Sequence, residues 1–220
     1  MTLELLRPIL TVDVVLLTLK DGELHVALQR RDRQPHSGRL ALIGGYVRPG
    51  QDVSTSAAAV RVLRNKAKVT SSFIDQLMTF SGNTRDPRGW SASVAYYALA
   101  PIESIPPDDR SLTMVPLSAA KGLPFDHDDI IAKAIERWRR RSAYSSLPAF
   151  LLTPTFTFST LRLAYEKMLG RTLNDSAFRR KIDELRVIEP VMGGTSKATA
   201  RPAQLYQLSN PSLAEFERAL

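Results

Sequence analysis

The sequence contains no cysteine and only three histidines among its 220 residues. Without cysteine there are no disulfides, no thiolate metal sites and no cysteine nucleophile. Three scattered histidines leave little for a zinc site. A bound metal ion would therefore need oxygen ligands.

Long apolar runs are also missing. No stretch approaches the roughly 20 residues that are needed to span a bilayer. Residues 1–10 carry Glu4 and Arg7 and lack the basic segment, apolar core and small-residue cleavage site of a signal peptide. We therefore expect a cytoplasmic protein that does not enter a membrane.

Acidic residues are outnumbered by basic ones. The chain has 30 Lys and Arg against 22 Asp and Glu, which gives a net charge of +8 and a pI near 10.0. Phosphate contacts and counterion release dominate nucleic-acid affinity, so this balance favours polyanionic partners. Composition alone does not distinguish a nucleic-acid-binding protein from one with a basic surface and no such partner. The positions of the charges in the sequence are needed to tell them apart.

The length and a change of pattern predict two domains. A chain of 220 residues exceeds one average domain and falls short of three. Residues 142–149, which contain serines and a proline, are typical of a linker. We expect an N-terminal domain over residues 1–143 and a C-terminal domain over residues 150–220.

The N-terminal half predicts an α/β domain. An apolar segment over residues 11–19, the pair Asp21-Gly22 and an alternating segment over residues 24–28 indicate a β-hairpin. Further along, periodicity and turn residues predict a helix over residues 53–67, strands over 73–80 and 93–99, and a helix over 128–141 with basic residues at its end.

Three glycines, Gly44, Gly45 and Gly50, precede the first expected helix. Glycines let backbone amides approach an anion, and the start of a helix adds a favourable dipole. A tight turn between strand and helix would use the same residues. Both interpretations stay open from these residues alone.

The segment around these glycines resembles a degenerate Nudix box. That box reads glycine, five residues, glutamate, seven residues, then Arg-Glu-hydrophobic-any-Glu-Glu-any-Gly-hydrophobic. With two extra residues before Arg61, the box fits at Gly45, Arg61, Leu63 and Val69, while Lys68 replaces its last glycine. Its glutamate positions are all occupied by other residues, namely Gln51, Val62, Asn65 and Lys66.

The loss of these acids changes the expected chemistry. Active Nudix enzymes hold Mg²⁺ with the helical glutamates, whose charge offsets that of the cation. Here Asp52 is a lone acid, and the segment carries four cations that would repel a metal and attract phosphate: Arg61, Arg64, Lys66 and Lys68. We therefore expect no catalytic residue, no metal and no cofactor. A basic helix face without a ligand is the alternative.

Four further segments are similar to Nudix-related transcriptional regulators of NAD metabolism, of the NrtR type. These are residues 76–80, 85–89, 93–99 and 123–134. The resemblance implies a Nudix-type α+β sandwich that binds ADP-ribose or a related nucleotide of the NAD or ATP class. His127 is expected to be a turn or packing residue and not a catalyst. The candidate effector contacts are Arg30, Arg31, Gly44, Gly45, Arg48, Arg61, Arg85 and Arg88. Structural ion pairing is the alternative for Arg30, Arg31, Arg48, Arg85 and Arg88.

The C-terminal half predicts a winged helix-turn-helix. A helix capped by Ser159 and ended by Gly170, a second helix capped by Asn174, and strands over residues 187–191 and 204–208 follow that order. Residues 158–171, 178–181 and 200–206 resemble the winged helix of the same family. Phe178, Ile182 and Leu185 have core spacing, which turns at least part of the basic cluster over residues 179–181 outward. The DNA-binding candidates are Arg179, Arg180, Lys181, Lys197 and Arg201.

These observations predict a transcriptional regulator, a repressor by resemblance, that forms a homodimer on double-stranded operator DNA. Its two winged helices would lie on half-sites about one helical turn apart, and a small nucleotide effector would oppose DNA binding. One alternative is an active Nudix nucleotide pyrophosphatase of the ADP-ribose type with an accessory domain, using an acid such as Asp126. Another is a nucleotide-binding adaptor whose winged helix contacts protein.

Overall fold

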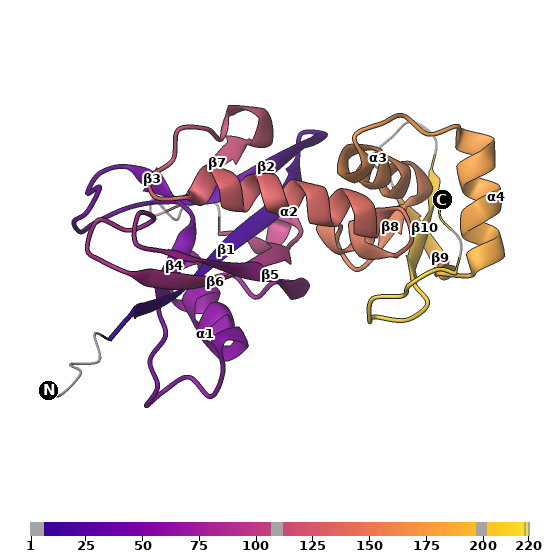
Figure 1. Cartoon of the computed structure of the whole chain (residues 1–220). Coiled ribbons are helices and arrows are strands. Elements are labelled where there is room, and N and C mark those ends of the chain that lie inside the picture. Colours follow the sequence, from indigo (N-terminus) through magenta and orange to yellow (C-terminus); the bar gives the residue numbers. More distant parts are fainter. Residues whose placement is uncertain (1–6, 107–111, 197–201, 218, 220) are drawn as a thin grey trace, which may run out of the picture.

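The computed structural model describes residues 7–106, 112–196, 202–217 and 219. The N-terminal half is an α/β sandwich, and the C-terminal half is a small domain of helices and a three-stranded sheet (Figure 1). Helix α2 (His127–Ser142) lies across the sandwich and reaches the C-terminal domain (Figure 1).

A seven-stranded sheet forms the middle of the sandwich, and β1 (Ile9–Lys20) is its central strand. β1 pairs antiparallel with β2 and β4 and parallel with β6. The other strands are β2 (Glu23–Arg30), β3 (Leu40–Ala41), β4 (Ile43–Tyr46), β5 (Phe73–Gly82), β6 (Ser91–Leu99) and β7 (Leu112–Pro116). The predicted hairpin is thus β1 with β2, and Asp21 and Gly22 form its turn with φ values of 50° and 75°.

The apolar run of β1 is explained by burial on both faces of the sheet. Val14 and Leu16 pack with helix α1 (Thr55–Val62), whereas Val15 and Leu17 pack with α2 on the opposite face. Because side chains alternate along a strand, a strand covered on both faces needs apolar residues at every position. The predicted α/β sandwich is confirmed.

Helix α1 continues into a π-helical turn. Ser54 caps α1 by accepting a hydrogen bond from the Ala57 amide, and residues Leu63–Ala67 then form the wider turn. The turn ends at Lys68, whose φ of 54° lies in the left-handed region that favours glycine. Lys68 therefore keeps the backbone shape of the glycine that it replaces in the Nudix pattern. Short 3₁₀ turns over Ile102–Ser104 and Leu117–Ala119 complete the domain.

The C-terminal domain has the order of a winged helix. Its elements are β8 (Phe156–Thr157), α3 (Phe158–Leu169), α4 (Asp175–Leu185), β9 (Ile188–Ser196) and β10 (Ala203–Leu208). Three rings form the centre of its core: Phe178 lies 5.5 Å from Phe158 and 5.1 Å from Tyr165 between ring centroids. Gly170 and Asn174 bound the helices as predicted. The predicted cap Ser159 is wrong, because Thr157 and Thr160 form the capping box that starts α3.

Residues 142–149 are packed, contrary to the linker that their composition suggests. Ser145 and Ser146 are buried and lead directly into a 3₁₀ turn, Leu147–Leu151, whose residues are also buried. The amide of Ser146 donates to the carbonyl of Ala214 (2.9 Å), and the Ala214 amide donates to the Ser146 hydroxyl (2.9 Å). The serines bind backbone groups of the chain's C-terminal segment, so they do not form an exposed, flexible connection.

The two domains share one hydrophobic core as a result. Trp138 of α2, Leu147 and Met168 of α3 belong to the same buried cluster as the α2 face of the sheet. The buried hydroxyl of Tyr165 donates to the Ser145 carbonyl (2.9 Å). The winged helix therefore packs directly on α2 and the turn that follows it.

Of the helices described between residues 7 and 219, none has the length and apolar character to cross a membrane.

Candidate functional site

A cleft of about 460 Å³ opens at one edge of the sandwich. Its walls come from β1, the loop after β2, β4, the end of α1, the loop between β5 and β6, and the start of α2. All eight predicted effector contacts line this single cleft: Arg30, Arg31, Gly44, Gly45, Arg48, Arg61, Arg85 and Arg88. The structure therefore brings together residues that lie up to 58 positions apart in the sequence.

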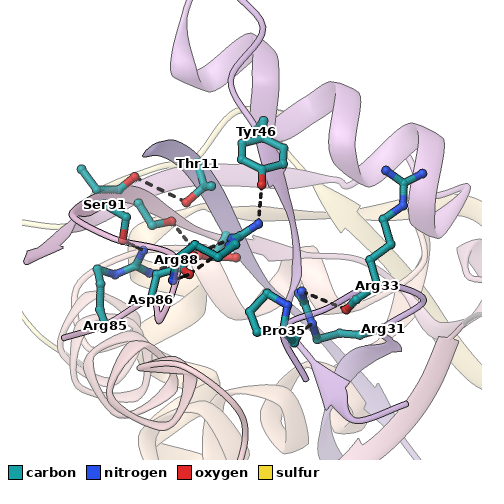
Figure 2. A network of polar contacts seen from close by, with 12 residues as sticks. Thr11, Arg31, Arg33, Pro35, Tyr46, Arg85, Asp86, Arg88 and Ser91 are labelled. Carbon is teal, nitrogen blue, oxygen red and sulfur yellow. Dashed lines mark hydrogen bonds and ion pairs between the residues drawn. The ribbon is translucent and has the colours of Figure 1, made fainter. Parts of the chain in front are cut away.

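One wall of the cleft is built around Arg88. Its guanidinium donates two hydrogen bonds to the carboxylate of Asp86 (2.9 and 2.6 Å) and a third to the hydroxyl of Tyr46 (Figure 2). The guanidinium carbon also lies 5.4 Å from the centroid of the Tyr46 ring. Asp86 is buried, whereas the Tyr46 ring is 52% exposed and so is available for stacking.

Arg31 forms the opposite part of the cleft wall. Its Nε donates to the carbonyl of Pro35 (2.8 Å; Figure 2), and its guanidinium carbon lies 4.8 Å from the centre of the Phe125 ring. Burial lowers the pKa of Arg31, and the nearby charge of Arg88 lowers it further. Because the two guanidinium groups repel each other, an anion that binds between them is expected to be stabilised by both.

The floor of the cleft holds a buried acid, Asp13 of β1. Ser93 donates to its carboxylate at 2.6 Å, and Arg85 and His127 Nε2 lie 3.6 and 3.7 Å away. The Leu42 amide donates to His127 Nδ1 (3.0 Å), so the imidazole is held on both sides. Burial lowers the pKa of His127, which favours the neutral ring. His127 is a buried packing residue, as predicted.

Arg85 connects the cleft to the first residue of helix α2. Its Nε and Nη2 each donate at 2.8 Å to the carboxylate of Asp126, which is the N-cap residue of α2, and Nη1 donates to Ser91 at 3.1 Å. The side chains of Arg85 and Asp126 are only 8% and 15% exposed. Such bidentate pairs fix geometry as well as charge. The pair therefore sets where α2 begins relative to the cleft.

The glycines have a different role from the predicted anion loop. Gly44 and Gly45 lie within β4, paired with Asp13 and Val12 of β1. A Cβ on Gly44 would lie 2.1 Å from Asp13 Oδ1, and one on Gly45 would lie 3.1 Å from a Val62 methyl. They line the cleft, but what their lack of a side chain permits is the close approach of Asp13 and of α1. The packing explains why both positions are glycine, and contact of their backbone with an effector stays a prediction.

The four cations of the Nudix-like segment divide into three groups. Arg61 is bound in two places to Asp52 (2.6 and 2.7 Å), and this hydrogen bonding lowers the pKa of Asp52 to about 2. Arg64 is exposed outside the cleft, and Lys68 folds back onto the carbonyl of Asn65 (2.9 Å). Only Lys66 of the remaining cations lines the cleft.

The residues of the cleft do not fit a divalent cation. Within residues 7–106, 112–196, 202–217 and 219, no three His, Asp or Glu side chains are grouped so as to hold a metal ion. Asp52, the one acid near the box, is held by Arg61, and the Lys66 ammonium donates to the Gly44 carbonyl at 2.6 Å. A cation already occupies the face where a metal would need carboxylates.

The candidate DNA interface is the outer face of α4. Phe178 and Ile182 are buried against α3, so Arg179 and Arg180 point away from the core, as predicted. The Arg179 guanidinium lies 3.9 Å above the ring of Phe158, which restrains its direction. Arg180 is exposed and 3.9 Å from Glu184, and Lys181 is half-buried. The candidates Lys197 and Arg201 lie outside the described residues.

Comparisons with known proteins agree with this architecture. The family model for the NrtR DNA-binding winged helix domain matches residues 148–208. The ADPR responsive transcriptional repressor NtrR of Acinetobacter baylyi is 35% identical over 207 residues, which is 92% of this chain and 82% of that protein. The chain belongs to the NrtR family of transcriptional regulators.

Two solved structures extend the comparison within the NrtR family. Shewanella oneidensis NrtR, crystallised with a 27mer DNA, matches 96% of this chain and 99% of that one at 34% identity, with a TM-score of 0.88. The NUDIX domain of the same protein, crystallised with ADP ribose, matches 60% of this chain and 89% of that one at 36% identity, with a TM-score of 0.56. The predicted fold, a Nudix-type domain followed by a winged helix, is confirmed.

Sequence reasoning missed the aromatic part of the cleft. Tyr46 and Phe125 both line the cleft, where Tyr46 contacts Arg88 and Phe125 contacts Arg31. They lie 79 positions apart and show no periodic signal. Only the folded sheet and the position of α2 bring them to one cleft.

Replacing Gly44 with alanine is expected to destabilise the protein by about 1–3 kcal/mol, because the new methyl group overlaps the buried Asp13 carboxylate. Gly50→Ala is the matched control, since a Cβ there meets nothing within 4 Å. Urea unfolding of both variants gives the two free energies of unfolding. Equal values for the two would contradict the assigned role of Gly44.

Proposed function

We propose that the protein is a transcriptional repressor that binds operator DNA through α4 and its wing and binds ADP-ribose in the cleft. The observation that carries the proposal is the arrangement around α2. A cationic cleft that contains aromatic rings lies at the start of α2, and the domain that packs on the end of α2 carries the exposed basic residues of α4. Relatives that respond to ADP-ribose and are crystallised with DNA support both halves.

The cleft has the chemistry that a nucleotide with a diphosphate requires. Arg31, Lys66 and Arg88 supply positive charge, and the rings of Tyr46 and Phe125 supply flat apolar surface for a base. ADP-ribose, NAD and ATP share these groups, and ADP-ribose is favoured by the ADP ribose complex of the related NUDIX domain. The eight cleft residues predicted from sequence are the proposed effector site.

We further propose that the cleft binds its nucleotide without hydrolysing it. Hydrolysis of a diphosphate by a Nudix domain needs carboxylates that hold a metal ion. Asp52 forms an ion pair with Arg61, and Asp126 forms one with Arg85. Asp126 is the acid that the alternative pyrophosphatase would use. Neither is placed as a free base.

Helix α2 is the proposed connection between effector and DNA. Its N-terminal end is held at the cleft by the Arg85–Asp126 pair, and its C-terminal part shares a core with α3. Arg141 near its end also binds Asp75 of β5 and Glu215 of the C-terminal segment. An effector phosphate that draws Arg85 away from Asp126 would change how α2, and the winged helix with it, sits on the sheet.

The functional units of this proposal are residues 1–143 and 150–220, and the active form is a homodimer. Two copies of α4 would then lie on half-sites about one helical turn apart. A change in the tilt of α2 in each copy would alter that spacing, so effector and operator would oppose each other.

We expect the protein to enrich one sequence from a random DNA library and to release it when ADP-ribose is added. Arg180→Ala should weaken binding to that sequence about tenfold or more, because an exposed arginine of α4 is lost. Lys133→Ala, on the exposed surface of α2, is the control that should bind as wild type. Fluorescence anisotropy over a salt series measures all three proteins.

No enriched sequence, or DNA binding that ignores ADP-ribose, would contradict the repressor. Weak DNA binding that does not depend on salt would favour the adaptor, since phosphate contacts impose a steep salt dependence.

ADP-ribose should remain intact when it is incubated with a high concentration of the protein and Mg²⁺ or Mn²⁺. The reason is that the carboxylates near the cleft are engaged by arginines. Chromatography of the nucleotide products is the measurement. Metal-dependent release of AMP that is lost in Asp126→Asn would establish the pyrophosphatase instead.

A further inference from the structure

Lys66 occupies a distinctive position among the basic residues of the Nudix-like segment. Leu63 and Ala67 are buried and anchor the π-helical turn, and between them the turn directs Asn65 and Lys66 to the cleft. The Lys66 ammonium donates to the Gly44 carbonyl at 2.6 Å, which fixes it beside β4. Lys66 therefore stands on the wall where the family pattern places a metal-binding glutamate.

The electrostatic surroundings of Lys66 favour an anion as its ligand. The side chain is open to the cleft, yet the protein around it desolvates the ammonium and lowers its pKa. The cations Arg31 and Arg33 lower this pKa further, while Asp32 and Asp13 act in the opposite direction. Lys66, Arg31 and Arg33 thus share one volume with Asp13 and Asp32, and the net positive charge that remains favours an anion.

The carboxylates that line the cleft do not compensate its cations fully, because three acids, Asp13, Asp32 and Asp86, stand among eight basic side chains. Each acid has an arginine beside it: Asp86 pairs with Arg88 at 2.6 Å, Asp13 lies 3.6 Å from Arg85, and Asp32 lies 3.7 Å from Arg33. Asp126 and Asp52 nearby are paired with Arg85 and Arg61. A divalent cation beside Lys66 would meet repulsion without a matching set of ligands.

We propose that the ammonium of Lys66 takes the place of the divalent cation, so that the chain itself neutralises the diphosphate of its nucleotide and binds it without metal. This inference rests on the proposed effector site and assigns its central contact. Arg31 would assist from the facing loop, and the Gly44 carbonyl would hold the ammonium in position. The site would then sense ADP-ribose independently of the supply of Mg²⁺.

The test is a calorimetric titration of the full-length protein with ADP-ribose, in EDTA and in Mg²⁺. Wild type should bind with the same affinity in both, within about twofold, and Lys66→Gln should bind at least about tenfold more weakly in both. Lys66→Arg should retain most of the affinity. Lys68→Gln removes an equal charge that folds onto Asn65 away from the cleft, and it should bind as wild type.

Rising pH gives a second readout that a purely structural lysine would not produce. Because the pKa of Lys66 is lowered, its charge is lost at a lower pH than that of an ordinary lysine, and ADP-ribose affinity should fall there. The charged groups that face Lys66 are Arg31, Arg33, Asp13 and Asp32. Lys66→Arg should bind without this decline.

The possible failures are distinct. Binding by wild type only when Mg²⁺ is present, or unchanged binding by Lys66→Gln, would overturn the role of Lys66 while the effector site stands. No binding of ADP-ribose by wild type in either buffer would overturn the proposed function and this inference together.

Discussion

The structure depends on helix α2 being held at both ends. At its start, Asp126 accepts two hydrogen bonds from Arg85 at the cleft, and His127 is fixed between Leu42 and Asp13. Along its length, Trp138 is buried in a core that α3 shares. Removing one partner of a largely buried ion pair such as Arg85–Asp126 costs about 3–5 kcal/mol. Helix α2 is thus the element through which we propose that a change at the cleft reaches the winged helix.

The chemistry of the cleft follows from the charge that the Nudix-like segment carries. Lys68 adopts the left-handed conformation that favours glycine, at the position where the Nudix pattern has one, and Arg61 binds an acid, Asp52. The difference from the Nudix pattern is the side chain that the segment presents to the cleft, which is Lys66 where the pattern has a glutamate. With Lys66 on the cleft wall and eight basic side chains against three acids along the cleft, the charge of the site favours an anion.

The sequence predicted the features that local pattern controls. The β1–β2 hairpin, the amphipathic α2, the Asn174 cap and the outward direction of Arg179 all depend on neighbours a few residues away. The predictions from sequence failed where contacts between residues far apart in the chain determine the structure. The serines near residue 145 are buried because Ala214, 68 positions from Ser146, binds them, and Gly44 is small because Asp13 of another strand needs the space.

The central claim, that α2 couples the cleft to the winged helix, is tested most directly by measuring ADP-ribose affinity with and without the DNA that the protein selects. Coupling requires that DNA weaken ADP-ribose binding by the same factor by which ADP-ribose weakens DNA binding, typically about 5–150-fold. Asp126→Asn should bring this factor close to one, whereas Asp129→Asn, an exposed acid in the same turn of α2, should preserve it. The account would be contradicted if ADP-ribose affinity were the same with and without DNA. It would also be contradicted if Asp126→Asn kept the coupling factor of wild type.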